Sequence, residues 1–422
     1  MRSKQPVAQI LSIAALLIVV MIIIPTCARA DVIAEWNQEA VRLATLPASR
    51  LSSTAQTRPM AIVQVSMHDA VNGITREYRT YLSPGPAPDG ASPEAAAIAA
   101  AHHSLRSLFP THAASLDAMF FASLAANGLS QTDPGIAYGQ WAAAAVIAVR
   151  AGDGAASTQY NYTAPRAGQP GVWVPLTSSP ALLPGWGRVT PWVLENNRQF
   201  MPPPPPGLRS HRYAIEYNET KTVGDKFSTT RTPEQTEIAA FWRASPTATW
   251  NQPLTSVIAS RSLSISARAR IYALVYLAEA DASIVCWEAK YLYNHWRPES
   301  AIHRGDEDWN GLTDPDPAWE PLYPTPRHPE YPSGNPMNSG AMAAIMANAF
   351  GDNPGIPVSA TINGITHQWA TFSEGVDEVV DARVYSGIHF RSADQMGADA
   401  GVDIANYVWA HTLRPCGRGR RC

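Results

Sequence analysis

Three segments in the last third of the sequence hold the residues whose types and spacing could do chemistry. In the first, "KYLYNHWRP" (290–298), Lys290 and Arg297 stand seven positions apart, and no acidic residue follows Lys290 at the third or fourth position. We expect both cations to project from one face of a helix that Pro298 ends, because seven residues make nearly two helical turns. Such a pair favours an external anion, although a solvated basic face is the simpler alternative.

The second segment, "HPEYPSGNPMNSG" (328–340), places a Pro-Ser-Gly turn directly before an Ala/Met-rich run that is typical of a helix. It offers the Ser333 hydroxyl and the Gly334 N–H at the start of that helix, where unpaired backbone N–H groups and the helix dipole favour an anion. Asn335, followed by Pro336, is predicted to be the N-cap of this helix, with its side chain bonding N–H groups of the first turn.

The third segment, "DARVYSGIHFRSADQ", begins at Asp381 and contains Arg383 and His389, with Gly387 between them as a predicted helix break. The last helix would then begin near His389. Taken singly, an arginine or a histidine is more often structural than catalytic. Together, the three segments supply three cations, a hydroxyl, a backbone amide and an imidazole for one tetrahedral oxyanion. The imidazole would attack phosphorus or coordinate the metal of a phosphate-like ion.

The elements that must position these segments are predicted to be almost entirely helical. Apolar residues recur at spacings of three and four along most of the chain, and alternating β-branched runs are scarce. The predicted helices span residues 31–44, 57–74, 92–109, 114–128, 135–154, 210–224, 232–244 and about 264–296, and two more close the chain. The fold class is therefore all-α, with sheet as a minor component.

Two long stretches lack helical periodicity. Residues 155–207 are rich in proline, glycine and tryptophan, and this apolar content favours a long loop packed on the body over a free linker. A second loop-rich stretch, residues 303–334, leads into the Pro-Ser-Gly turn. We divide the chain into an N-terminal helical region at 31–245, a catalytic helical bundle at 246–415 and a basic tail at 416–422.

The composition and the first thirty residues indicate the class of protein and its cellular compartment. A net charge of −3 and a charged fraction of 16% argue against a nucleic-acid-binding protein. Residues 1–30 are predicted to be a signal peptide, with a basic start, an apolar run at 10–24 and a small-residue cleavage site, "ARA", before Asp31. An uncleaved anchor is the alternative, but the run is shorter than the roughly 20 residues that span a bilayer. We expect a secreted or periplasmic protein with no membrane span after cleavage.

Three cysteines follow the predicted signal peptide. Cys416 and Cys422 could close a small loop in an oxidising compartment, whereas Cys286, in an apolar helical run, is predicted to be a buried free thiol. No cysteine and histidine spacing indicates zinc.

The three chemical segments, in this order, resemble the vanadium-dependent haloperoxidase and type 2 phosphatidic acid phosphatase superfamily, in its secreted bacterial branch. The family pattern is Lys-x6-Arg-Pro, then Pro-Ser-Gly-His, then Arg-x5-His, and it covers residues 290–389 here. The resemblance implies helical bundles with long Pro/Gly-rich loops and a bound vanadate, whose site phosphate can also occupy. It implies that the oxyanion is held by Lys290, Arg297, Ser333, Gly334 and Arg383, with His389 as the vanadium ligand or as a phosphatase nucleophile and Trp287 in the pocket.

Asn335 departs from the family pattern, which has a histidine at this position. The family histidine assists proton transfer, whereas an asparagine side chain can only donate or accept hydrogen bonds at neutral pH. Two nearby histidines could compensate. His328 lies where bromide-oxidising members of the family carry a histidine, and His295 is expected on the helix of Lys290 and Arg297.

Three functions stay open at this point. The leading prediction is oxidation of a halide, bromide being favoured, by hydrogen peroxide with vanadate as cofactor. The second is an acid phosphatase that acts on a small phosphate ester through His389. The third is a non-catalytic phosphate- or vanadate-binding protein that has the oxyanion-binding residues but lacks the proton shuttle.

Overall fold

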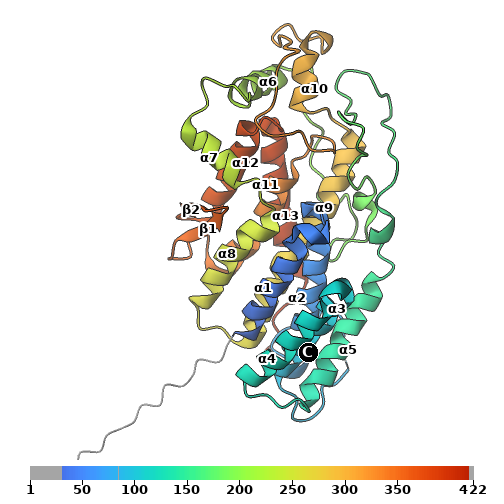
Figure 1. Ribbon diagram of the computed structural model, residues 1–422, viewed down its shortest axis with the longest axis vertical. Helices are drawn as coiled ribbons and strands as arrows, with labels where there is room; N and C mark the ends of the chain where they lie inside the picture. The colour runs from blue at the N-terminus through green and yellow to red at the C-terminus, as the bar shows by residue number, and fades with distance from the viewer. Residues whose placement is uncertain (1–30, 84, 418–422) are drawn as a thin grey trace, which may run out of the picture.

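The computed structural model describes residues 31–83 and 85–417. These residues form thirteen α-helices and one short antiparallel hairpin, so the predicted all-α class is confirmed (Figure 1). The helices are α1 (Val32–Thr45), α2 (Ser53–Thr75), α3 (Pro93–Leu108), α4 (Ala113–Ala126), α5 (Pro134–Arg150), α6 (His211–Val223), α7 (Pro233–Phe241), α8 (Pro246–Ala259), α9 (Ile265–Tyr293), α10 (Pro298–His303), α11 (Gly334–Phe350), α12 (Phe372–Tyr385) and α13 (Arg391–His411). The hairpin pairs β1 (Val358–Ile362) with β2 (Ile365–Trp369).

Local capping explains why most of these helices begin where the sequence predicts. A serine or threonine precedes each of several helices and accepts a hydrogen bond from a backbone N–H of the first turn, as Ser92 does for α3 and Thr232 for α7. Proline follows the cap in both helices, at a position where its missing N–H costs nothing. Two helices, α8 and α10, lie outside the predicted set.

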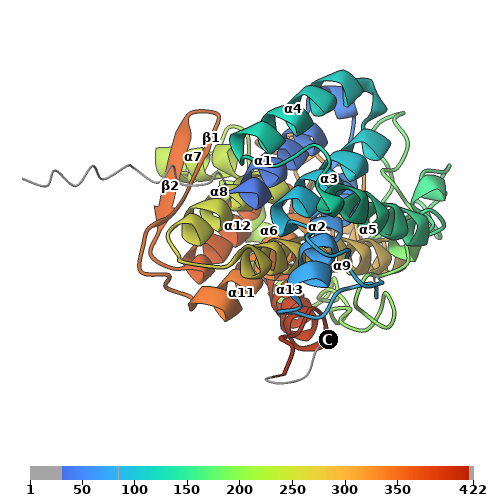
Figure 2. The ribbon, with the colours of Figure 1, turned by 90° about the horizontal axis from the view of Figure 1, so that it is seen from below.

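Helix α9 runs through the centre of the molecule. Every residue from 269 to 287 is buried, because α2, α11 and α13 pack around it (Figure 2). The long helices lie side by side along the longest axis, with α6 and α10 at one end and α3, α4 and α5 at the other (Figure 1). One hydrophobic core includes residues from both predicted regions of the chain, from Trp36 on α1 to Ile404 on α13.

The closest helix pair positions two of the chemical segments. Helices α11 and α13 approach each other at glycines: a Cβ on Gly340 would lie 2.5 Å from the Ala398 carbonyl oxygen, and one on Gly401 would lie 2.0 Å from that of Met337. Because the backbones touch there, the start of α11 and the residues just before α13 are held at fixed positions relative to each other. Larger side chains at these glycines would force the two helices apart.

The segment 155–207 is a packed loop without α-helix, as predicted. Its tryptophans Trp173, Trp186 and Trp192 are buried. The Asp281 carboxylate on α9 accepts hydrogen bonds at 2.6, 2.8 and 3.1 Å from three successive N–H groups of this loop, residues 192–194. The loop is therefore fixed to the central helix rather than free.

The remaining predictions from the sequence have mixed outcomes. Cys286 is buried and free, as predicted. Among the described helices, none is long and apolar enough to cross a membrane. The signal peptide at 1–30 and Cys422, the second member of the predicted cysteine pair, lie outside the described residues. The division at residue 245 stays a prediction.

Candidate active site

Lys290 and Arg297 meet in space, but the predicted common helix face is wrong. Helix α9 ends at Tyr293, and Asn294 takes the left-handed conformation with φ of 47°. Arg297 follows in an extended conformation (φ −81°, ψ 156°) as the N-cap residue of α10. The reason is Pro298, which excludes helical geometry at the residue before it. The chain therefore turns before Arg297 reaches the site.

Arg297 is the hub of the site. Its fully buried guanidinium donates from Nη1 to the Ile388 carbonyl oxygen (2.6 Å) and to Nε2 of His389 (3.0 Å). From Nη2 it donates to Nδ1 of His328 (3.0 Å), and from Nε to the carbonyl oxygen of the same residue (3.0 Å). Arginine has no acceptor atom. Both histidine nitrogens that face Arg297 therefore present lone pairs.

His389 is held as a neutral imidazole with a defined tautomer. Its Nδ1–H donates to Oε1 of Glu330 at 2.9 Å, and the N–H of Phe390 donates to the same oxygen at 3.0 Å. The pKa of His389 is lowered well below its ordinary value, first by burial and then by Arg297 and Lys290. Burial raises the pKa of Glu330 to about 7, and the two cations oppose that rise. Two donors on one oxygen favour the carboxylate form of Glu330, which orients the ring of His389.

Lys290 lies against the backbone of Pro329 and Glu330. Its Nζ donates to the carbonyl oxygens of Pro329 and Glu330, both at 2.9 Å, and the residue is fully buried. Burial lowers the pKa of Lys290 to about 8, so the ammonium form still dominates at neutral pH. An ammonium group has three donors. These two bonds leave one N–H of Lys290 for another acceptor.

The start of α11 differs from the prediction at Asn335. Ser333 occupies the N-cap position and Gly334 begins the helix, so Asn335 is the second helical residue and the predicted cap is wrong. The side-chain amide of Asn335 instead donates to the carbonyl oxygens of Trp242 (3.1 Å) and Ala244 (3.4 Å). A Cβ on Gly334 would lie 3.3 Å from the Trp287 ring. The backbone thus approaches the cavity wall as closely as glycine allows.

Arg383 reaches the site from α12 and has unused donors. Its Nη1 donates to the Trp242 carbonyl oxygen at 3.1 Å, and its buried Nε has no hydrogen-bond partner among the described residues. The fully buried Asp394 interacts electrostatically with Arg383. Burial raises the pKa of Asp394 well above its ordinary value, while the Ser333 hydroxyl and Arg383 partly oppose this rise. The unused Nε marks Arg383 as a residue that awaits an anion.

A cavity of about 240 Å³ opens over these groups. The predicted residues that line it are Trp287, His328, Gly334, Asn335, Arg383 and His389. Lys290, Arg297 and Ser333 are buried behind this lining. His295 does not line the cavity: it is buried beside Phe390, and burial lowers its pKa to about 4. Of the two compensating histidines, the structure therefore brings only His328 to the cavity.

Three further residues near the cavity were missed by the analysis of the sequence. Glu330 lies three positions before Ser333, and an acidic residue inside the segment "HPEYPSG" was a usable signal. Asp394 had a weaker signal, since it follows His389 by five positions. Arg243 had none, because the fold brings it from the end of α7, far away in sequence.

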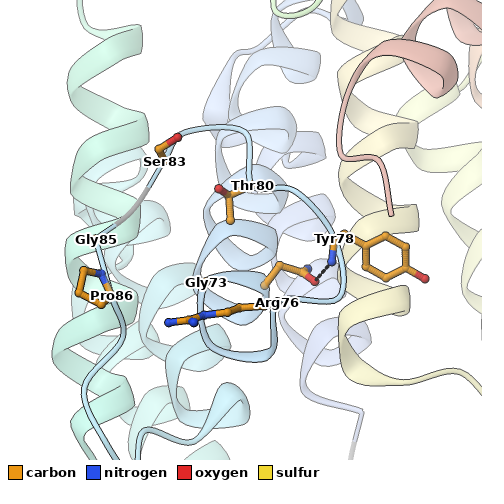
Figure 3. A pocket seen from close by; sticks show the side chains of 8 residues that line it. Gly73, Arg76, Tyr78, Thr80, Ser83, Gly85 and Pro86 are labelled. Carbon is orange, nitrogen blue, oxygen red and sulfur yellow. Dashed lines mark hydrogen bonds between the residues drawn. The ribbon is translucent and has the colours of Figure 1, made fainter. Parts of the chain in front are cut away.

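A second cavity of about 270 Å³ lies at the opposite end of α2 (Figure 3). It is lined by Asn72, Gly73, Arg76, Tyr78, Thr80, Ser83, Gly85 and Pro86. Arg76 is the one cation that lines it, and no histidine does. None of the predicted site residues reaches this cavity.

Comparisons with known proteins agree with the site. The family described as the VCPO second helical-bundle domain matches residues 270–417. Vanadium chloroperoxidase of Curvularia inaequalis is 26% identical over 202 residues, which make up 41% of this chain and 33% of that protein. The structure of a bacterial vanadium-dependent iodoperoxidase superposes with a TM-score of 0.77 at 25% identity, covering 90% of this chain and 97% of the other. Residues 270–417 thus match a domain of vanadium chloroperoxidases, and the described chain has the fold of a bacterial vanadium-dependent iodoperoxidase.

A bacterial chloroperoxidase shares the fold at lower sequence identity. The structure of a holo-type bacterial vanadium-dependent chloroperoxidase superposes with a TM-score of 0.69 at 16% identity, covering 87% of this chain and 94% of the other. The present chain spans about a third of the length of the curated relative that it matches.

The residues of this site fit a vanadate ion. The donor set holds three cations, the unused Nε of Arg383 and the close backbone approach at Gly334. His389 presents an unprotonated Nε2, the atom type that binds a metal centre, and Glu330 fixes its tautomer. Without a ligand, Nη1 of Arg297 contacts the lone pair on Nε2 of His389. An anion bound to Nε2 would replace this contact and would lie beside the positive charge of Arg297.

Proposed function

We propose that this protein is a vanadate-dependent haloperoxidase that uses hydrogen peroxide to oxidise a halide, with bromide favoured. The observation that carries the proposal is the neutral His389, whose Nε2 faces a buried group of cations while Glu330 holds Nδ1–H. His328 at the cavity supports the preference for bromide, because bromide-oxidising members of the family carry a histidine there.

In this proposal the residues divide the work around the cofactor. When bound, vanadate supplies a Lewis-acidic centre that activates hydrogen peroxide. His389 supplies the coordinating lone pair, and Glu330 keeps the ring oriented. Lys290, Arg297 and Arg383 offset the negative charge of the oxyanion and polarise its oxygens. Because these cations are buried and already positioned, their stabilisation of developing charge requires little rearrangement.

Proton transfer is assigned to His328 rather than to Asn335. The Asn335 amide cannot exchange protons at neutral pH, and it already bonds the Trp242 carbonyl oxygen. His328 lines the cavity and accepts a hydrogen bond from Arg297 at Nδ1, so its proton sits on Nε2. Burial and the neighbouring cations lower the pKa of His328. An oxyanion in the cavity would offset those cations and bring the pKa back towards the range of a useful acid–base group.

The proposal is tested by loading the purified protein with orthovanadate and measuring the peroxide-dependent oxidation of bromide. We expect turnover that requires vanadate, that His389→Ala abolishes and that His328→Ala reduces by about 10²-fold or more. Hydrolysis of p-nitrophenyl phosphate by the vanadate-free protein is measured alongside. Phosphatase activity without any oxidation of bromide would overturn the proposal, as would tight vanadate binding without either activity.

We also propose that the protein is exported and works outside the cytoplasm. The support is the basic, apolar and small-residue pattern of residues 1–30. Asp31 accepts hydrogen bonds from the N–H groups of Ile33 and Ala34, both at 3.2 Å, and so caps α1. Cleavage before Asp31 would keep this cap in the mature protein. Intact-mass analysis of protein from the envelope or medium should give an N-terminus at Asp31, and a full-length mass would contradict it.

A further inference from the structure

A third cavity, of about 400 Å³, lies at the start of α9 and shares no lining residue with the cavity over His389. Arg270 lines it, whereas Lys290, later on the same helix, belongs to the candidate active site. An α-helix rises about 1.5 Å per residue, so roughly 30 Å of α9 separate the two residues. The residues that line the third cavity take no part in the proposed reaction.

Arg270 is a buried cation without a carboxylate partner. The residue is 7% exposed, and its Nε donates to the Leu413 carbonyl oxygen at 2.7 Å. No other hydrogen bond or ion pair within residues 31–83 and 85–417 involves its guanidinium, so the four N–H groups of its two Nη atoms lack an acceptor there. Burial lowers the pKa of Arg270, and the phenol of Tyr78 opposes this change. A buried charge without an opposite charge is costly, which favours an anion from outside the chain.

Two aromatic rings fix the plane of the Arg270 guanidinium. Its central carbon lies 4.3 Å from the ring centroid of Trp409 and 5.0 Å from that of Tyr78. The Tyr78 ring is directed away from Arg76 (Figure 3). Stacking leaves the N–H groups at the edge of a guanidinium free to bind a carboxylate through two parallel hydrogen bonds. Arg270 is therefore already oriented for a planar anion with two oxygens.

Arg261 brings a second cation to the same cavity. It lies in the loop before α9, where Nη2 donates to the Pro354 carbonyl oxygen and the guanidinium carbon lies 5.9 Å from the ring centroid of Phe350. No acidic residue is among the described residues that line the cavity. Glu77 does not line it and accepts the Ser264 hydroxyl at 2.8 Å. Two arginines thus border one cavity without a carboxylate in its lining.

The apolar walls decide which anion suits this cavity. Besides Tyr78, they include Leu263, Ile271, Phe350 and Trp409. Cavities of about 300–1,000 Å³ with apolar walls and few polar groups are typical of sites for small organic molecules. A halide or phosphate ion would bind the arginines but would leave these walls in contact with water. An aromatic carboxylate uses both features, because its ring packs against the walls and its two oxygens match a guanidinium.

The simpler alternative is that both arginines are structural. Helices α11 and α13 end beside this cavity, and the carbonyl end of a helix attracts cations. Arg261 and Arg270 each donate to one carbonyl oxygen that follows such an end. These two hydrogen bonds use only a part of the donors, since each guanidinium has five N–H groups. The apolar cavity between the arginines is also left without an explanation, so the two roles predict different results with a ligand.

We propose that Arg261 and Arg270, with the rings of Tyr78, Phe350 and Trp409, form a binding site for a small aromatic carboxylate. Arg270 would bind the carboxylate through its edge N–H groups, and Arg261 would add a second positive charge. The ring of the ligand would pack against the apolar walls. The site is independent of the proposed function, because it shares no lining residue with the cavity over His389.

Benzoate is the probe, and an NMR titration measures its binding to the purified protein with inorganic phosphate in excess to occupy the oxyanion site. We expect one benzoate per chain, with about tenfold or more weaker binding in Arg270→Gln and partial recovery in Arg270→Lys. Benzamide, which has the same ring and no charge, should bind about tenfold or more weakly than benzoate. Arg76→Gln, which removes the cation of the second cavity, is the matched control and should leave benzoate binding unchanged.

Two further variants keep the test decisive if Arg270→Gln does not fold. Ala267→Phe should fill the cavity and abolish benzoate binding with both arginines still present. Arg261→Gln changes a partly exposed side chain and should weaken the binding of benzoate about two- to fivefold. Benzoate binding that persists in Ala267→Phe, or that phosphate displaces, would place the ligand elsewhere and overturn the proposal. No binding to the unchanged protein would also overturn it, because the two arginines would then be structural.

Discussion

Two cavities of similar size lie at opposite ends of α2, and they differ in almost every chemical respect. The cavity near Ser53 and Thr54, of about 240 Å³, lies over His389 and the buried cations. The cavity near Asn72 and Arg76, of about 270 Å³, is bounded by a loop whose residues Ser83, Gly85 and Pro86 are exposed (Figure 3). Size alone therefore does not distinguish a reactive site from a surface hollow in this protein.

The difference lies in burial and in the polar ends of helices. Helix α2 presents its positive end to the first cavity and its negative end to the second. In the first cavity, burial lowers the pKa of Lys290 to about 8, and that of His389 also falls. Holding Lys290, Arg297 and Arg383 together near His389 costs free energy unless an anion offsets their charge. The guanidinium of Arg76 can instead form hydrogen bonds with solvent. This contrast predicts where substitutions should have large effects and where they should not.

The largest expected effect follows from replacing Arg297, which contacts both His328 and His389. Arg297→Met should abolish vanadate binding and lower the free energy of unfolding by about 3–5 kcal/mol, because it leaves the carbonyl oxygens of His328 and Ile388 without their donor and removes a cation that offsets the buried carboxylate of Glu330. Arg76→Met should change the free energy of unfolding by less than about 0.5 kcal/mol. Urea denaturation of both variants measures the difference. Equal stabilities of the two variants would remove the contrast between the cavities.

The next effect is a gain at Asn335. Asn335→His places a second imidazole at the cavity; because His328 is assigned the proton transfer, the gain of about 10²–10⁴-fold in halide oxidation should appear in the His328→Ala background, where an acid–base group is missing. Asn335→Ala should leave the rate almost unchanged and cost about 1 kcal/mol of stability through the lost hydrogen bond to Trp242. The measurement is the steady-state rate of halide oxidation by each variant with vanadate in excess. If Asn335→His gains nothing while His328→Ala is inactive, His328 alone transfers the proton.

A smaller effect is expected at Glu330, which positions His389 without touching the oxyanion. Glu330→Gln should weaken vanadate binding roughly 10–100-fold, since the ring loses the carboxylate that fixes its tautomer. The pH profile of binding should also change, and a merely structural role would not produce that change. Glu39→Gln, which removes a surface carboxylate paired with Arg42, is the control. Titration calorimetry of both variants across pH 5 to 8 is the measurement.

The smallest effect concerns pH and Lys290. Its folded-state pKa of about 8 is below the ordinary value of 10.5, because burial disfavours the charged form. An anion binds the protonated form better, so vanadate affinity should fall by up to about tenfold per unit as the pH rises above 8. Below pH 8 Lys290 should contribute no pH dependence. In Lys290→Met this decline above pH 8 should vanish; its persistence would assign the decline to another group.

The sequence predicted the class of fold and most helix positions because both follow local rules. Apolar spacing and serine or threonine caps identify α1 to α7 and α9 without tertiary information. Helix α8 has Pro253 within it, and tertiary packing rather than local preference maintains it. The end of α9 was misplaced by three residues, because the left-handed conformation of Asn294 depends on the packing that follows.

The site was predictable where its chemistry lies in short segments. Lys290, Arg297, Arg383 and His389 were identified from their order, and the structure places them around one cavity. The role of Asn335 was mistaken because the competing acceptor, the Trp242 carbonyl oxygen, is 93 positions away in sequence. Arg243 was missed for the same reason. Contacts between segments far apart in sequence require the folded chain.

The most direct test of the central claim is the binding of orthovanadate to the unchanged protein, His389→Ala and Arg76→Ala, measured by titration calorimetry at neutral pH. We expect one ion per chain for the unchanged protein and for Arg76→Ala with equal affinity, and a loss of at least about 10²-fold in His389→Ala. Equal affinity in all three proteins would show that vanadate binds elsewhere and would contradict the assignment of His389 as its ligand.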